Sequence, residues 1–379
     1  MALKQAPPVI VGAGLAGSAA AVLLARQGFA PRLLERTATV SPRICGEFVS
    51  VEAVQALAAL GVDVLALGGR PTRRLRLSCG SLVVEAALPF EAVGLTRRTL
   101  DGALQQQAQA AGALLQRGQR VSVQHLGSDM HPFMLQLAGG ERLSTQTLLL
   151  ACGKTDLAPL ARRPQRVPEA LVGWQVHLQL AAQQANALEG HVEVMLFRQG
   201  YAGLQPVEGG LVNLCLLAQA DSSTEHKAPS LQTLLQTLQQ QCPLLAERLS
   251  GATWMGPAQT IYRVPYGHLH RSAPEDPAGL WRLGDQAVVI PSFTGDGMAL
   301  ALHTAALAAH EWAQGGSAKN YHARLRSDVS AQVARASALY RLGRGPLGRS
   351  ALLGLVRRWP ALLSFIAAMT RVAPQRLLW

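Results

Sequence analysis

The chain has 379 residues, of which 49% are hydrophobic and 15% are charged. This composition can bury a large core and excludes a disordered chain, and the length favours two domains over one. The net charge of +12 suits an anionic partner such as a dinucleotide, an acidic substrate or a membrane surface. Because the arginines are scattered and only 5% of the residues are aromatic, we expect no binding to nucleic acid.

Cysteine spacing and hydropathy bear on the compartment. The cysteines form no Cys-x-x-Cys pair, which favours a reducing compartment and predicts no metal site. No apolar run reaches the ~18 residues that a transmembrane helix needs. We therefore expect a cytoplasmic protein, and the sequence leaves its oligomeric state open.

A nucleotide-binding pattern lies at the N-terminus. The β-branched run 9–11 predicts a buried strand, and the small apolar segment 18–27 predicts a helix. Between them, Gly12 permits a tight turn, Gly14 lets the backbone approach a pyrophosphate, and Gly17 lets the helix pack against the strand. The helix N-terminus then offers free N–H groups and a positive dipole to phosphates.

An acid completes this pattern. A second strand is predicted at 31–34, and Glu35 follows it, 23 residues after Gly12. An acid at this distance accepts hydrogen bonds from a ribose. It favours an unphosphorylated ribose, and therefore FAD or NAD over NADP.

A second pattern lies far downstream. Residues 281–285 predict a strand that ends in Gly-Asp at Asp285, and the loop with Pro291, Gly295 and Gly297 precedes an apolar helix at 299–312. These motifs resemble the p-hydroxybenzoate hydroxylase type of FAD-dependent aromatic hydroxylases, and the geranylgeranyl reductase branch of that superfamily. The resemblance implies that Asp285 binds the ribityl chain of FAD and that the glycine loop covers the pyrimidine end of the flavin. Backbone N–H groups there can stabilise negative charge on reduced flavin.

Three further segments extend the resemblance. The segment from Arg97 to Asp101 matches the family's Arg-x-x-Leu-Asp helix start, and this resemblance implies that Arg97 lies beside the flavin. It also implies that a strand at 120–123, with Val121, lies near the adenine. Cys45 and Gly46 resemble the Cys-Gly segment of the reductase branch, which passes close to the isoalloxazine. The residues expected at the cofactor are Gly12, Gly14, Ala16, Gly17, Glu35, Arg36, Cys45, Gly46, Arg97, Val121, Asp285, Pro291, Gly295, Asp296, Gly297 and Met298.

Two departures bear on the reaction. Cys152 stands where the superfamily carries an acid that supports binding of flavin and reduced nicotinamide, which puts direct reduction by NADPH in doubt. Tyr201, Gly203 and Gln205 stand where the isoprenoid reductases carry a Tyr-x-Trp-x-Phe-Pro segment. The space at Gly203 and the amide of Gln205 favour a polar-headed, aromatic substrate, with packing alone as the alternative. The Lys and Trp-x-Trp-x-Ile-Pro motifs of flavin halogenases are not apparent.

The expected fold is α/β, with a doubly wound Rossmann-type FAD domain, an interleaved antiparallel-sheet substrate domain and a helical tail. The FAD domain is predicted at 1–70, 95–165 and 265–335, the substrate domain at 71–94 and 166–264, and the tail at 336–379. The tail is apolar with spaced arginines, so it either covers the substrate pocket, packs in the core or makes peripheral contact with a membrane.

The first functional hypothesis is an FAD-dependent monooxygenase of secondary metabolism, with NADPH or NADH as electron donor and a small lipophilic aromatic or polyketide-like substrate. The second is a flavin-dependent reductase of isoprenoid-type C=C bonds. The third is a non-catalytic flavin-binding lipid carrier. No acid or base is assigned; His177, His191 and His268 are candidates by residue type alone.

Overall fold

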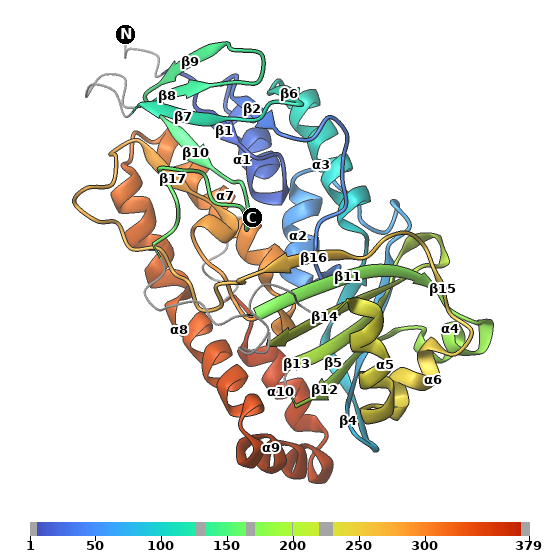
Figure 1. Cartoon of the computed structure of the whole chain (residues 1–379). Helices are drawn as coiled ribbons and strands as arrows, with labels where there is room; N and C mark the ends of the chain where they lie inside the picture. Colours follow the sequence, from blue (N-terminus) through green and yellow to red (C-terminus); the bar gives the residue numbers. More distant parts are fainter. Residues whose placement is uncertain (1–5, 126–132, 164–170, 199, 220–229, 373–379) are drawn as a thin grey trace.

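The computed structural model describes residues 6–125, 133–163, 171–198, 200–219 and 230–372. Two lobes, each built on its own large sheet, lie side by side, and long C-terminal helices run along both (Figure 1). The chain passes between the lobes repeatedly, because strands of both sheets alternate along the sequence. This is the predicted α/β class with an interleaved second domain.

A five-stranded parallel sheet forms the first lobe, in the order β17-β10-β1-β2-β6. Its strands are β1 (Val9–Val11), β2 (Arg32–Glu35), β6 (Leu114–Arg117), β10 (Leu148–Leu150) and β17 (Leu280–Arg282). They are short and apolar because both faces of the sheet are covered.

The two faces of this sheet pack against different layers. Ile10 belongs to the helical core, whereas Val9 and Val11 belong to a separate core with Phe133 and Leu135. The helical face is covered by α1 (Leu15–Arg26), α2 (Val51–Ala59), α3 (Arg97–Ala111) and α7 (Gly297–Ala313). The opposite face is covered by the antiparallel strands β7 (Ser122–His125), β8 (Phe133–Gln136) and β9 (Arg142–Thr145).

A nine-stranded, mostly antiparallel sheet forms the second lobe, in the order β15-β11-β14-β13-β12-β4-β5-β3, with β16 paired to β11. Its strands are β3 (Phe48–Val49), β4 (Arg70–Cys79), β5 (Leu82–Gly94), β11 (Leu171–Gln179), β12 (His191–Phe197), β13 (Gly200–Pro206), β14 (Val212–Gln219), β15 (Thr253–Trp254) and β16 (Gln259–Tyr262). Residues 171–176 of β11 are all buried, so both faces of this strand are covered. The helices of this lobe are α4 (Ala182–Leu188), α5 (Leu231–Gln241) and α6 (Pro243–Leu249), and the Ser230 side chain caps α5 by accepting from the Thr233 N–H.

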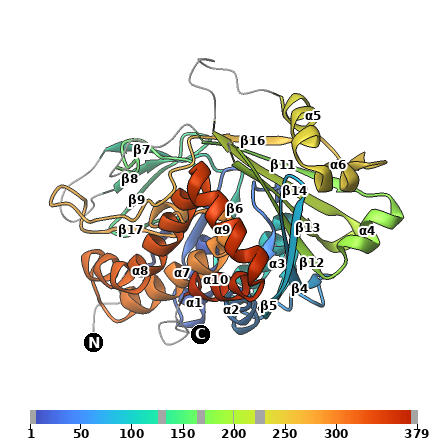
Figure 2. The same cartoon turned by 90° about the horizontal axis from the view of Figure 1, so that it is seen from below.

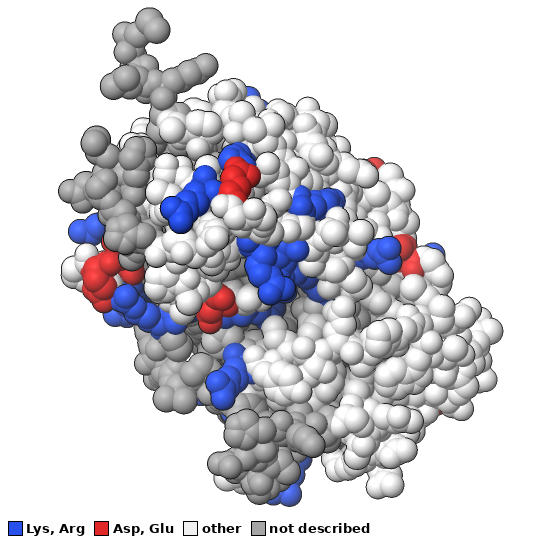
Figure 3. Space-filling view, turned by 45° about the horizontal axis from the view of Figure 1, so that its top comes forward, with Lys and Arg blue, Asp and Glu red and all other residues white. Residues whose placement is uncertain are grey.

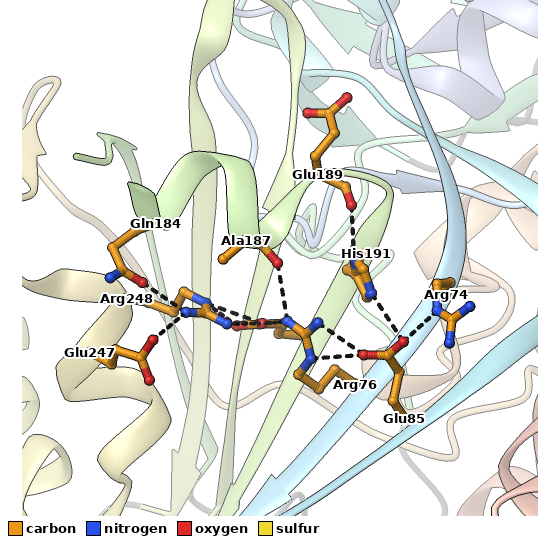
Figure 4. A network of polar contacts seen from close by, with 10 residues as sticks. Arg74, Arg76, Glu85, Gln184, Ala187, Glu189, His191, Glu247 and Arg248 are labelled. Carbon is orange, nitrogen blue, oxygen red and sulfur yellow. Dashed lines mark hydrogen bonds and ion pairs between the residues drawn. The ribbon is translucent and has the colours of Figure 1, made fainter. Parts of the chain in front are cut away.

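A buried charge cluster holds the outer part of this lobe together (Figure 4). Glu193 of β12 is fully buried and pairs with Arg76 of β4 and Arg248 of α6. Arg76 also bonds Glu85 on β5, and Arg248 bonds Gln184 on α4. Two guanidinium groups thus neutralise one buried carboxylate, which is the condition under which such a charge is tolerated.

The C-terminal region consists of α8 (Ala318–Arg344), α9 (Pro346–Arg358) and α10 (Ala361–Met369). The helix α8 runs across the predicted domain boundary at 335, so the tail is a continuation of a helix of the first lobe. Seen from below, α9 and α10 lie beside each other under both lobes (Figure 2). Leu352, Val356 and Leu363 pack against Leu77 and Val84 of the second sheet. The tail therefore covers one face of that sheet.

Candidate cofactor and substrate site

The N-terminal glycines meet different constraints at the carboxyl end of β1. Gly12 has φ of 104°, and a Cβ there would lie 2.4 Å from the carbonyl oxygen of Ala151. A Cβ on Gly17 would lie 1.9 Å from the carbonyl oxygen of Gly12. A Cβ on Gly14 would meet only the Arg97 guanidinium, at 3.6 Å. Gly12 and Gly17 are therefore required by the fold, whereas Gly14 leaves the backbone open at the N-terminus of α1, where a phosphate can approach.

Glu35 at the end of β2 is buried and organises this loop. Its Oε2 accepts a hydrogen bond from the Ala13 N–H at 3.0 Å, and its Oε1 accepts from Thr37 and from Arg43 at 3.0 Å. Burial would raise the pKa of this carboxyl, but Arg43 and the backbone donors lower it overall. Glu35 is thus an anion with a preformed set of donors, at the position where the sequence predicts a ribose contact.

Arg97 opens α3 directly beside Gly14. Its guanidinium forms a bidentate pair with Asp101, with both contacts from Nη2 at 2.9 Å. Although burial opposes the charge, Asp101 and Cys45 raise the pKa of Arg97, so this residue stays a cation. Arg97 therefore lies beside the glycine loop, and its placement beside the flavin stays a prediction.

Asp285 follows β17 and pairs with Lys154, which follows β10. The Lys154 Nζ lies 3.0 Å from Asp285 Oδ2, and Asp285 raises the pKa of this lysine. Arg162 donates to the backbone oxygens of both residues, which fixes the two loops to each other. Lys154 is not among the residues that the sequence predicts at the cofactor. Its signal was a basic residue just after a strand of the parallel sheet, at the edge where ligands bind.

The downstream loop brings a second helix N-terminus to the same region. Gly295 has φ of 72°, and a Cβ there would lie 2.6 Å from the Phe48 ring. Gly297 begins α7 with open space around its Cα, and Met298 is buried below it. The side chain of Asp296 points away, since its Oδ1 lies 2.7 Å from Arg371 and it is fully buried. Any contact from Asp296 to a cofactor would therefore come from its backbone.

The Cys45–Gly46 segment lies against the second sheet. The Cys45 N–H donates to Gln175 Oε1, and Asn213 donates to the Cys45 carbonyl oxygen at 2.8 Å. Gly46 has open space around it. Among the described residues, Gln175 Nε2 and Asn213 Oδ1 are buried without a hydrogen-bond partner. Unsatisfied buried polar atoms are costly, so this pair points to a ligand or water between the lobes.

Glu47 joins the two lobes next to this segment. It is fully buried, with φ of 55°, a conformation that non-glycine residues rarely adopt. Its Oε1 accepts from the Arg97 N–H, and its Oε2 lies 2.7 Å from His177 Nε2 on β11. Glu47 raises the pKa of His177. The sequence offered His177 only by residue type, and its partner was not foreseen because the two lie 130 residues apart.

The predicted substrate residues divide into two groups. The Tyr201 hydroxyl forms a hydrogen bond with the Ser292 hydroxyl, which lies in the glycine loop before α7. The Tyr266 hydroxyl forms a hydrogen bond with the same Ser292 hydroxyl. Burial holds the pKa of Tyr201 well above its usual range, so it is a neutral phenol. Gly203 is two residues further along β13 and leaves space at its Cα. The Gln205 amide nitrogen, by contrast, donates to Thr72 and to the Pro206 carbonyl oxygen. Only the Gln205 amide oxygen is left without a partner among the described residues.

The remaining candidates lie further apart. Arg36 bonds the Thr155 hydroxyl at the edge of the first sheet, and Val121 is buried against the three-stranded sheet. Burial raises the pKa of Cys152 to about 11, so this thiol cannot replace a carboxylate. His191 lies beside Glu85 in the outer charge cluster, and His268 contacts the backbone at Gln286, so neither joins Glu47.

These residues fit a dinucleotide that carries a flavin. The first lobe offers two open helix N-termini for a diphosphate and buried Glu35 for a ribose. Arg43, Arg97 and Lys154 are each paired with a carboxylate, and Arg36 bonds Thr155. Lys and Arg side chains gather beside the hollow between the lobes (Figure 3). The unpaired amide atoms on β11 and β14 provide polar contacts for a planar heterocycle.

Comparisons with known proteins agree with this geometry. Residues 5–152 match the family described as FAD binding domain. The menaquinone reductase of Mycobacterium tuberculosis (strain CDC 1551 / Oshkosh) is 28% identical over 318 residues, which cover 80% of this chain and 76% of that protein.

Solved structures show the same fold at low sequence identity. The flavin-dependent brominase Bmp2 has a TM-score of 0.78 at 17% identity, over 97% of this chain and 93% of its own. A flavoprotein/dehydrogenase from Cytophaga hutchinsonii has a TM-score of 0.78 at 13% identity, over 97% and 92%. The halogenase PltM has a TM-score of 0.72 at 13% identity, over 98% and 89%.

The geranylgeranyl reductase branch stays a prediction, since none of these matches singles it out. The superfamily and the cofactor, by contrast, are supported by the matched domain and by the fold of the whole chain. Residues 5–152 therefore match the FAD binding domain family, and the whole chain has the fold of flavin-dependent enzymes.

Proposed function

We propose that this protein uses FAD to hydroxylate or oxidise a lipophilic, oxygen-bearing ring substrate, with NADPH or NADH as the electron donor. The observation that carries the proposal is the wall between the lobes, where phenolic hydroxyls and apolar side chains meet. Tyr201, Tyr266 and Ser292 form one hydroxyl cluster, and Leu217 and Phe293 lie beside it in one apolar cluster. An aromatic ring with a hydroxyl or carbonyl group suits such a wall.

We propose that a second pair of groups between the lobes, separate from this hydroxyl cluster, supplies a proton donor and acceptor. His177 Nε2 and Glu47 Oε2 are 2.7 Å apart and can share one proton, which makes them a general acid–base pair between the lobes. Burial keeps the thiol of Cys215, on the neighbouring strand β14, neutral by raising its pKa to about 12. FAD supplies electron transfer and reaction with oxygen when bound, and the protein positions the ring and limits water.

A second candidate is reduction of an isoprenoid-type C=C bond. It is favoured by the similarity to a protein named menaquinone reductase and by the Cys45–Gly46 segment. Halogenation is not proposed, because the solved halogenases share the fold at identities below 25% and the halogenase motifs are not apparent in this sequence.

One experiment separates these reactions. Small molecules that co-purify with the protein are identified by mass spectrometry and added back to the FAD-loaded enzyme, which is reduced anaerobically and then exposed to oxygen. The proposal predicts fast reoxidation and a product that has gained oxygen or lost hydrogen. A product that gains two hydrogen atoms without oxygen would establish the reductase, and no turnover with any reductant would favour the lipid carrier.

A further inference from the structure

The charge of this protein is concentrated at its C-terminal end. From Val329 to Trp379 the sequence has eight arginines and neither lysine nor any acidic residue, so this segment carries +8 of the net +12. Within the described residues it comprises the second half of α8 with α9 and α10. Arg371 is paired with Asp296 inside the protein and Arg376 lies outside the described residues, so six of these arginines remain on the surface of α8 and α9. A surface with this charge attracts an anionic partner and repels a second copy of itself.

The outward faces of α9 and α10 are apolar. Leu347, Ala351, Leu355 and Arg358 recur at helical spacing along α9, and all are exposed, Leu347 by 86%. On α10, Ala361, Phe365 and Met369 form a second exposed row. Trp359 is 57% exposed between the two helices, with the Arg358 guanidinium 6.0 Å from its ring centre. An apolar face with arginines at its ends is typical of helices that lie in the plane of a membrane surface.

The geometry of α9 and α10 excludes a straight helix across a membrane. Among the described residues no single helix is long and apolar enough to cross a bilayer; Leu347–Arg358 and Ala361–Met369 reach that length only as a pair bent by 120°. Their inner faces are already packed on the second sheet through Leu352, Val356 and Leu363. The outer faces therefore remain for contact at a surface.

A basic cavity lies at the start of α9. It has a volume of about 490 Å³ and is lined by Arg198, Gln219, Arg341, Arg344 and Gly345. Arg344 is held in place by Gln219 and lies over the ring of Tyr340. No carboxylate is among these lining residues, and arginine forks match phosphate oxygens. The exposed Leu342 and Leu347 flank the cavity along the chain.

We propose that α9, α10 and the arginine-lined cavity form a docking surface for an anionic phospholipid bilayer. A lipid phosphate enters the cavity, and the exposed leucine, tryptophan and phenylalanine side chains reach the acyl boundary. Apolar burial and attraction to anionic headgroups then act together. The inference is independent of the reaction at the flavin, but it gives a lipophilic substrate a short path to the protein.

The test is sedimentation of the full-length, FAD-loaded protein with two kinds of vesicle, pure phosphatidylcholine and phosphatidylcholine mixed with phosphatidylglycerol. We expect binding to the mixed vesicles at low ionic strength, release in about 0.5 M salt, and little binding to the neutral vesicles. The double variant Arg198→Gln/Arg341→Gln should bind the mixed vesicles at least tenfold more weakly. Leu347→Gln/Trp359→Gln should weaken binding as well, and the binding that remains should depend on salt as steeply as that of the unmodified protein.

The matched control is Arg163→Gln/Arg324→Gln, which removes the same charge from exposed positions on the first lobe. It should bind like the unmodified protein, and retained flavin absorbance verifies that every variant is folded. If the control and the cavity variant lost vesicle binding to the same extent, the proposal would be overturned. Absence of binding to anionic vesicles at low salt would overturn it as well. A dimer in light scattering that Leu347→Gln/Trp359→Gln disrupts, without vesicle binding, would instead assign the surface to a second copy of the chain.

Discussion

Gly14 differs from the two glycines beside it, because nothing in the protein itself requires it to lack a side chain. A Cβ there meets only the flexible end of Arg97, whereas a Cβ on Gly17 meets a carbonyl oxygen at 1.9 Å. We predict that Gly14→Ala leaves thermal unfolding of the apo-protein nearly unchanged and weakens FAD binding about tenfold or more, since the added methyl group lies where the pyrophosphate approaches. Gly17→Ala should unfold at a clearly lower temperature. FAD binding by Gly14→Ala at unmodified strength, measured by calorimetry, would place the cofactor elsewhere.

Glu35 and Asp285 are the two acids expected at the sugar hydroxyls, and they come from opposite halves of the chain. Loss of either acceptor leaves a buried hydroxyl unpaired, at a cost of about 1–3 kcal/mol. Glu35→Ala and Asp285→Ala should each weaken FAD retention about tenfold, and Glu35→Ala should also loosen the Ala13 loop that it holds. Glu275→Ala, at an exposed ion pair with Arg163, is the control and should retain FAD fully. Unchanged FAD dissociation constants in both acid variants would contradict the assignment.

At the scale of elements, Asp296 ties α7 to the residues after α10. It contacts Arg371 and Gln332, and burial together with Glu52 raises its pKa to about 7 in spite of Arg371. The folded protein therefore binds a proton between about pH 4 and about pH 7 that the unfolded chain releases, so the free energy of unfolding should fall as the pH rises through this window. Asp296→Asn should remove this fall, whereas Glu141→Gln at an exposed position should not. Urea unfolding of both variants at a series of pH values measures this difference in the free energy of unfolding.

At the scale of the whole molecule, the Glu47–His177 pair links the lobes. Because Glu47 raises the pKa of His177, the pair contributes stability that is fully present below about pH 6.5 and is lost as the pH rises through the folded-state value. His177→Gln should lower the unfolding temperature at low pH and flatten its pH dependence. The exposed His310→Gln should leave the profile as it is. The same profile in His177→Gln and the unmodified protein would show that the pair does not couple the lobes.

The sequence predicted what local patterns determine, and it missed what the fold brings together. The glycine loop and Glu35 lie within a short stretch of the chain, so their spacing alone was enough to predict them. Glu47 meets His177 only because strands of both sheets alternate along the chain, and Lys154 meets Asp285 because β10 and β17 are neighbours in one parallel sheet. The hydrogen bond of Gln205 to Thr72 could likewise not be predicted, because β4 and β13 are separated by more than a hundred residues.

The account as a whole depends on FAD as the bound cofactor. The most direct measurement is to purify the protein, record its absorption spectrum, denature it and quantify the released nucleotide by chromatography. The account predicts a yellow protein that releases FAD, about one molecule per chain at saturation, with Gly14→Ala and Glu35→Ala depleted in parallel. A colourless protein that binds NAD tightly and does not take up added FAD would contradict it.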